Sequence, residues 1–243
     1  MTKNAKTRLY VDGPLGAEQT VLLTKDQANR LFAVMRLAVG DFVALFNGKD
    51  GEWLARVVEA GKRKGVLVCE KQSKPQQNPP DLWLLFAPIK KARTEFIVEK
   101  ATELGAARVF PVLTDFTNSD RLNPDRLQAH MVGATQQCGG TYVPPLEPMQ
   151  KLAKLLGDWP ADRQLLFCDE TIAGRAVEDL RDASGGKWAI LIGPEGGFSE
   201  AEAAGLRAMD LATSISLGPR ILRADTAAVA ALTLWQAALG DWG

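Results

Sequence analysis

The chain has 243 residues, of which 46% are hydrophobic and 24% are charged, enough for one large domain or two smaller ones. Its 29 basic and 29 acidic side chains balance, so no overall basic character indicates a nucleic-acid partner. Three distant cysteines and a single histidine argue against a disulfide framework and against a clustered transition-metal site.

The charges are unevenly distributed along the chain. Up to residue 93 there are 16 Lys and Arg against 9 Asp and Glu, and acidic residues dominate afterwards. Such asymmetry is typical of a polyanion-binding module at one end, although solvated surface charges explain it equally well. The first residues lack the apolar stretch of a signal peptide, and residues 226–240 are too short to span a bilayer. We therefore expect a cytoplasmic protein.

The first part of the chain predicts a small β-barrel that carries one helix. Helical spacing of Leu31, Val34 and Met35 predicts a helix within residues 24–37. Residues 41–60 hold two apolar runs separated by Asn-Gly and Asp-Gly, a hairpin signal, and residues 64–70 add a strand. The proline-rich stretch KPQQNPPD then predicts a boundary, so we assign residues 1–74 to the barrel and 80–243 to a second domain.

Strands and helices alternate in the second domain. Apolar runs predict strands at residues 82–88, 108–113, 164–170, 187–193 and 213–218. Helical patterns occupy residues 93–105, 123–140 and 226–239, the second of them with Asn123 as its N-cap. This alternation predicts a mostly parallel sheet with helices on both faces.

Two similar turns occur near the C-terminus, in LIGPEGGFSEAE (191–202) and LGPRILRADTAA (217–228). Each follows an apolar run, breaks at Gly-Pro and opens a helix, which Ser199 and Glu202 cap in the first case. In an open parallel sheet, ligands bind where strands end and helices begin. Glycines at 193, 196, 197 and 218 would let the backbone approach such a ligand.

The sequence excludes several ligand and enzyme classes at these turns. GPEGGF does not fit the dinucleotide-binding fingerprint, and no P-loop is present. His130 precedes Ser199, which contradicts the residue order of an α/β-hydrolase. Methyl transfer from S-adenosylmethionine remains, because it needs position and electrostatics rather than a metal, histidine or cysteine. The residues alone leave open that the glycines only form tight turns.

These two motifs, together with EFIVEKATELGA (95–106) and GATQQCGG (133–140), resemble the ribosomal RNA small subunit methyltransferase E family of the SPOUT class. The resemblance covers essentially the whole chain. It implies an N-terminal PUA-like β-barrel that binds RNA, a trefoil-knotted C-terminal α/β domain with a mostly parallel sheet, and a homodimer. The implied reaction is methylation of N3 of one uridine in 16S ribosomal RNA by S-adenosylmethionine, without a metal.

The resemblance also implies which residues hold the cofactor, namely Leu166, Phe167, Ile192, Gly193, Glu195, Gly196, Gly197, Leu217, Gly218, Ile221, Leu222 and Arg223. Arg223 is the first catalytic candidate, because a guanidinium can hold the uracil oxygens or a phosphate in a fixed fork. An equally supported role for Arg223 is a structural ion pair with Asp225 or Glu195. Glu195 is the second candidate, as a base if burial raises its pKa, with acceptance of backbone N–H groups as the favoured alternative.

Candidate phosphate contacts are Arg8, Arg30, Arg36, Lys90, Lys91 and Arg93. The sequence departs from the family pattern at Asp225, where a glutamate is usual, and at Gly140, where a basic residue is expected. Two other functions stay open at this point: a SPOUT enzyme that methylates a ribose 2′-hydroxyl, and a ribosome-assembly factor that binds RNA without catalysis.

Overall fold

Two units divide the chain in the computed structural model, which describes residues 4–119, 121–169, 171, 180 and 186–242. The N-terminal unit comprises Met1–Asn78 together with Thr135–Val143. The C-terminal unit comprises Pro79–Ala134 and Pro144–Gly243. The proline-rich stretch lies where the first division occurs, but nothing in the sequence indicated that residues 135–143 belong to the N-terminal unit.

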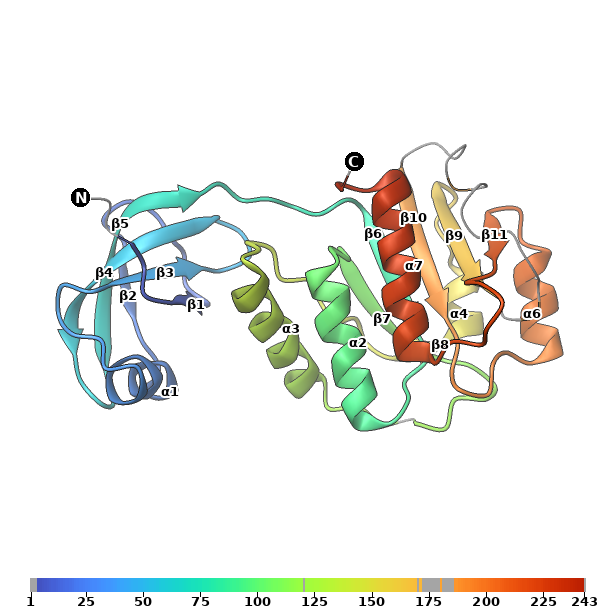
Figure 1. Ribbon diagram of the computed structural model, residues 1–243, viewed down its shortest axis with the longest axis horizontal. Coiled ribbons are helices and arrows are strands. Elements are labelled where there is room, and N and C mark those ends of the chain that lie inside the picture. Colours follow the sequence, from blue (N-terminus) through green and yellow to red (C-terminus); the bar gives the residue numbers. More distant parts are fainter. Residues whose placement is uncertain (1–3, 120, 170, 172–179, 181–185, 243) are drawn as a thin grey trace. The chain divides into compact units, whose positions relative to one another are not determined.

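The N-terminal unit is a curled five-stranded sheet, a half-barrel rather than a closed barrel (Figure 1). The predicted hairpin is confirmed, since its two strands pair antiparallel and the predicted third strand follows them. Two further strands of three residues each, β1 and β2, form the edges and were missed. In sheet order the strands are β1 (Arg8–Tyr10), β3 (Phe42–Phe46), β4 (Glu52–Ala60), β5 (Gly65–Lys74) and β2 (Thr20–Leu22).

The predicted helix of this unit begins as α1 (Lys25–Ala28) and continues as the π-helix η1 (Asn29–Val34). Leu31 is fully buried in the core of the sheet, as expected. Val34 and Met35 are instead exposed, 69% and 38%, because the wider π-helical turn rotates them off the face that an α-helix would bury. The helix was therefore predicted correctly and its buried face only in part.

Arg8 joins the sheet to residues 135–143 within the N-terminal unit. Its Nε lies 2.6 Å from the Glu52 carboxylate, and both side chains are largely buried. The guanidinium also donates to the carbonyl oxygens of Thr135, Gln136 and Gly140 at 2.5–2.8 Å. These bonds occupy the donors that a phosphate contact would require.

The C-terminal unit contains a six-stranded sheet in which every recorded strand pair is parallel, which confirms the predicted mostly parallel sheet. The short β8 and the helix that follows it were not predicted. In sheet order the strands are β11 (Ala212–Ile215), β9 (Arg163–Cys168), β10 (Lys187–Ile192), β6 (Leu82–Phe86), β7 (Arg108–Leu113) and β8 (Gln150–Lys151).

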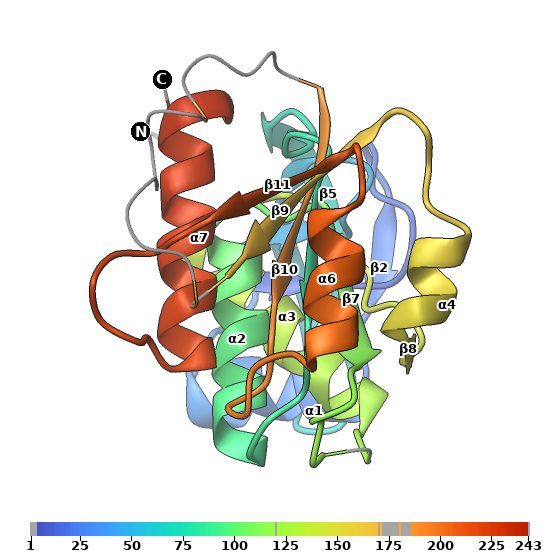
Figure 2. The same cartoon turned by 90° about the vertical axis from the view of Figure 1, so that its right-hand side faces the viewer.

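Helices cover both faces of this sheet (Figure 2). One face packs against α2 (Lys91–Glu103), α3 (Pro124–Cys138) and α7 (Ala224–Leu239), and the other against α4 (Leu152–Gly157) and α6 (Glu200–Arg207). Side chains alternate between the faces along each strand, so Leu84 enters the first core and Leu85 the second. Within the described ranges, no helix is long and apolar enough to cross a membrane.

The chain order of the strands brings three strand ends together. β10 lies between β6 and β9, and β11 lies on the other side of β9. The direction in which successive strands are added therefore reverses near β10, and such a switch point opens a crevice at the carboxyl ends of the strands. Both Gly-Pro turns follow strands at this edge.

Candidate cofactor and active site

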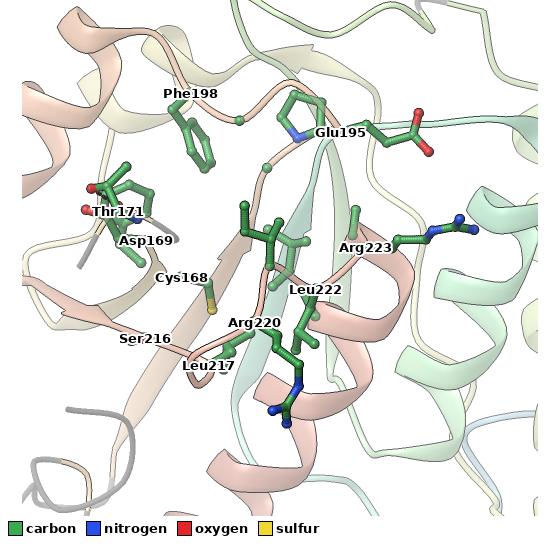
Figure 3. A pocket seen from close by; sticks show the side chains of 18 of the residues that line it. Cys168, Asp169, Thr171, Glu195, Phe198, Ser216, Leu217, Arg220, Leu222 and Arg223 are labelled. Atoms are coloured by element: carbon green, nitrogen blue, oxygen red, sulfur yellow. Dashed lines mark hydrogen bonds between the residues drawn. The ribbon is translucent and has the colours of Figure 1, made fainter. Parts of the chain in front are cut away.

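A cavity of about 360 Å³ lies at the carboxyl ends of β9, β10 and β11 (Figure 3). The turn after β10 and the loop from Ser216 to Arg223 form most of its wall. Each turn leads into a helix. Ser199 and Glu202 form the predicted capping box at α6, and Arg223 is the N-cap residue of α7.

Ten of the twelve expected cofactor residues line this cavity: Phe167, Ile192, Gly193, Glu195, Gly197, Leu217, Gly218, Ile221, Leu222 and Arg223. Leu166 does not, because its side chain is fully buried in the core beneath α2 and α7. Gly196 does not either, because the position of its missing Cβ faces Phe116 at 3.4 Å. The two Gly-Pro turns thus form one cavity wall, as the strand order requires.

The cavity offers backbone donors between apolar walls. Among the described residues, the N–H groups of Gly193, Leu217 and Leu222 form no hydrogen bond. Apolar side chains such as Ile192 stand beside them. A nucleoside needs this combination, because its base is flat and apolar while its edge and ribose form hydrogen bonds. The residues present therefore fit the adenosine part of S-adenosylmethionine.

Two glycines have a geometric reason to be glycine. A Cβ on Gly193 would lie 2.6 Å from the ring of Phe198, which also lines the cavity. Gly218 has a φ of +107°, a conformation that other residues rarely adopt.

Several lining residues were missed from the sequence, among them Cys168, Asp169 and Thr171, which directly follow or end β9. Although burial opposes it, hydrogen bonds from Thr171 and Arg207 hold the pKa of the Asp169 carboxyl below its ordinary value. Burial raises the pKa of the Cys168 thiol to about 12, so Cys168 is a neutral thiol at pH 7 and no nucleophile. They lie at the end of the predicted strand 164–170 or one residue beyond it, so applying the strand-end rule to this strand as well would have found them.

Glu195 and Asp225 pair with Arg93 and not with Arg223, the partner considered from the sequence. Arg93 of α2 contacts the Glu195 carboxylate at 2.7 Å and lies 3.8 Å from that of Asp225. The Arg223 guanidinium has no ion pair or hydrogen bond with the described residues, so the alternative pairing considered for it is not observed. The Glu195 side chain is 48% exposed and lacks the burial that a general base would need. Figure 3 shows Glu195 and Arg223 on the same side of the cavity.

The remaining basic candidates differ in availability. Arg30 and Arg36 are exposed, and their guanidinium groups have no partner among the described residues. Lys90 and Lys91, at the start of α2 in the other unit, are exposed as well. Arg8 and Arg93 are instead held in the ion pairs described above. Within the described part of the chain, no group of three or more His, Cys, Asp and Glu residues could hold a metal ion.

Comparison with protein families assigns both parts of the chain. Residues 76–236 match the model of an RNA methyltransferase domain. Residues 23–68 match the model of an RNA methyltransferase PUA domain. The fold and the site thus define an RNA methyltransferase that carries an N-terminal PUA domain.

Known proteins specify this class further. The chain is 30% identical over 228 residues to ribosomal RNA small subunit methyltransferase E of Rickettsia conorii, and the match covers 93% of each protein. Its similarity to the protein of the same name from Synechocystis is also 30%, over 237 residues, and covers 93% of this chain and 75% of that protein. The chain belongs to the ribosomal RNA small subunit methyltransferase E family.

Two solved structures are similar over nearly the whole length. One is ribosomal RNA small subunit methyltransferase E of Neisseria gonorrhoeae bound to S-adenosyl methionine, with 27% identity, a TM-score of 0.85 and coverage of 98% and 99%. The other is a methyltransferase of Legionella pneumophila in complex with the same cofactor, with 26% identity, a TM-score of 0.85 and coverage of 97% and 98%.

Proposed function

We propose that this chain methylates N3 of a uridine in 16S ribosomal RNA with S-adenosylmethionine as the methyl donor. The observation that carries this proposal is the cavity at the strand ends, with its free N–H groups on Gly193, Leu217 and Leu222. The cofactor-bound relatives from Neisseria gonorrhoeae and Legionella pneumophila support the choice of cofactor. The names of the curated relatives support the choice of RNA.

The chain's own residues account for most of what this reaction needs. S-adenosylmethionine supplies an activated methyl group. The backbone N–H groups of the two turns orient the adenosine, which positions the reacting centre. Arg223, which has no partner among the described residues, holds the uracil oxygens and stabilises the anion that forms when N3 loses its proton. Because the Arg223 guanidinium stabilises the uracil anion, solvent can accept the N3 proton. No side-chain base is then required, and Glu195 can remain paired with Arg93.

Calorimetric titration with S-adenosylmethionine, followed by single-turnover transfer of a labelled methyl group to 16S ribosomal RNA, tests the proposal. We expect saturable binding of the cofactor and incorporation of label into the RNA. Failure of both would overturn the proposed function. Cofactor binding without transfer to any form of this RNA, naked or assembled, would overturn the choice of substrate.

Replacing Arg223 by Ala should lower the single-turnover rate by about 10- to 100-fold, the range for a lost hydrogen bond to a charged group. RNA affinity should fall less than the rate, because the contact is strongest once the uracil anion forms. Arg223→Lys keeps the positive charge without the planar fork. Its single-turnover rate should therefore lie between those of the wild type and Arg223→Ala. Equal losses in RNA affinity and in rate would show that Arg223 only binds the substrate.

We further propose that Arg30 and Arg36 of the N-terminal unit contact RNA phosphates. Both are exposed, Arg30 within the π-helix and Arg36 immediately after it. Arg36 has a φ of +58°, which is unfavourable for a residue with a side chain. Strained conformations and π-helical turns both concentrate at functional sites.

The double variant Arg30→Ala with Arg36→Ala should bind RNA more weakly and with a flatter salt dependence. Each lost phosphate contact should reduce the slope of log affinity against log salt by about 1. The matched control is Lys62→Ala with Arg63→Ala, which removes the same charge from an exposed turn of the same unit. Equal slopes for the two double variants would contradict a specific role for Arg30 and Arg36.

We also propose a cytoplasmic homodimer with the trefoil knot of the SPOUT class. The family resemblance supports this proposal. Leu232 and Trp235 of α7 are buried in the core of the C-terminal unit, so a surface that a partner subunit covers does not include them.

A further inference from the structure

Arg93 contacts two segments that border the proposed cofactor cavity. It lies in the first turn of α2, and its side chain is 28% exposed. Its Nη1 donates to Oε1 of Glu195, in the turn after β10, at 2.7 Å. Its Nε lies 3.8 Å from Oδ2 of Asp225, in the first turn of α7. One guanidinium therefore links the turn after β10 to the start of α7, the helix that directly follows the second Gly-Pro turn.

We infer that Arg93 is a positioning residue that fixes the two turns relative to each other, rather than a contact for RNA phosphate. This inference rests on the proposed function, because the turns it positions are those that would hold S-adenosylmethionine. By taking both carboxylates, Arg93 also leaves Arg223 without a competing partner at the cavity.

The turns need such an anchor because their own backbones are permissive. Gly197 and Gly218 adopt φ values of +70° and +107°, and glycines lower the cost of alternative conformations. α2 is by contrast a rigid base, since Ile97 and Val98 are fully buried in the core that α7 shares. An ion pair from this helix to the first turn, and a second to the helix start at which the other turn ends, restrict both turns.

The position of Arg93 does not serve the stability of its own helix. A cation in the first turn of a helix is opposed by the helix dipole, whereas an anion in that place is favoured. Arg93 is thus unfavourable for α2, and Asp225 is favourable for α7. The contact between them links helices at a cavity wall, where the link affects ligand binding.

Asp225 makes the weaker of the two contacts. At 3.8 Å from Nε, its carboxylate forms an ion pair with Arg93 but is too far away for a hydrogen bond. A side chain that is one methylene longer would reach the guanidinium directly. Asp225→Glu should therefore tighten the second contact and restrict the turns further.

The test measures the affinity of the full chain for S-adenosylmethionine and its salt-dependent RNA binding. Arg93→Gln should raise the cofactor dissociation constant about fivefold, the upper range for a partly exposed ion pair. Arg93→Lys should recover part of this loss, and Asp225→Glu should lower the constant about twofold. The salt slope of RNA binding should stay that of the wild type in Arg93→Gln, because no phosphate contact is lost.

The matched control is Arg126→Gln, which breaks a comparable ion pair between α3 and Glu95 of α2 away from the cavity. This control should leave cofactor affinity unchanged and lower thermal stability about as much as Arg93→Gln does. If Arg93 acts through Glu195, adding Glu195→Gln to Arg93→Gln should weaken binding no further.

Wild-type cofactor affinity in Arg93→Gln would overturn this inference alone, as would a reduced salt slope of RNA binding without any change in cofactor affinity. A wild-type chain that binds no S-adenosylmethionine would overturn the proposed function, and the inference with it.

Discussion

Gly193→Val should weaken S-adenosylmethionine binding by about 150-fold or more. The first added atom would lie 2.6 Å from the ring of Phe198, so either the turn or the ring must move. Phe198 packs edge-on against Phe167 at 5.1 Å, and both rings line the cavity, which leaves little room for that movement. Overpacking of this kind costs about 3 kcal/mol, and the branched side chain also screens the free N–H of Gly193.

Calorimetry of the variant measures this effect, and thermal unfolding shows whether the fold persists. Gly205→Val is the matched control, because Gly205 lies in α6 and a Cβ there would meet nothing within 4 Å. The control should bind the cofactor like the wild type. Unchanged binding by Gly193→Val would mean that the cofactor lies elsewhere.

Arg8→Ala should destabilise the N-terminal unit by about 3–5 kcal/mol, the cost of removing one partner from a buried ion pair. The Glu52 side chain is only 7% exposed and would lose its cationic partner. Three carbonyl oxygens of residues 135–140 would lose their donor at the same time. The segment that these bonds hold should then separate from β1.

Urea unfolding of the full chain measures the loss, with Arg56→Ala as the control. Arg56 pairs with Glu70 on the same sheet, but their side chains are 41% and 27% exposed, so its removal should cost less than about 1 kcal/mol. If both variants lost the same small amount of stability, Arg8 would not be the link that its contacts indicate. Weak RNA binding by Arg8→Ala alone would then reflect a phosphate contact.

Local patterns predicted the elements of the fold well. The strands and helices of the parallel sheet follow from apolar runs and helical spacing, and the caps at Asn123 and Ser199 mark helix starts correctly. The three-residue strands β1 and β2 are too short to show any periodicity, so they were missed. The π-helical turn that exposes Val34 and Met35 is likewise invisible to an analysis based on a period of 3.6 residues.

The site was predictable where it depends on the backbone and not where it depends on distant side chains. Because ligands bind at strand ends, the sequence indicated both Gly-Pro turns as candidate ligand loops, and the family resemblance implied that they hold one cofactor. Arg8 contacts carbonyl oxygens that lie 128 and 132 residues further along the chain, and Arg93 contacts Glu195, which lies 102 residues further. Only the tertiary fold brings these groups together. In the sequence, both arginines therefore resembled free basic residues. Arg8 in fact joins the N-terminal sheet to residues 135–143, and Arg93 pairs with Glu195.

Mass spectrometry of nucleosides tests the central claim most directly. The purified chain, S-adenosylmethionine and 16S ribosomal RNA from a strain without this enzyme would be incubated, and the RNA digested to nucleosides. The proposed function predicts 3-methyluridine as the single new product, at one site per RNA molecule. A 2′-O-methylated nucleoside would contradict the assigned chemistry, and tightly bound RNA without any new methyl group would contradict catalysis itself.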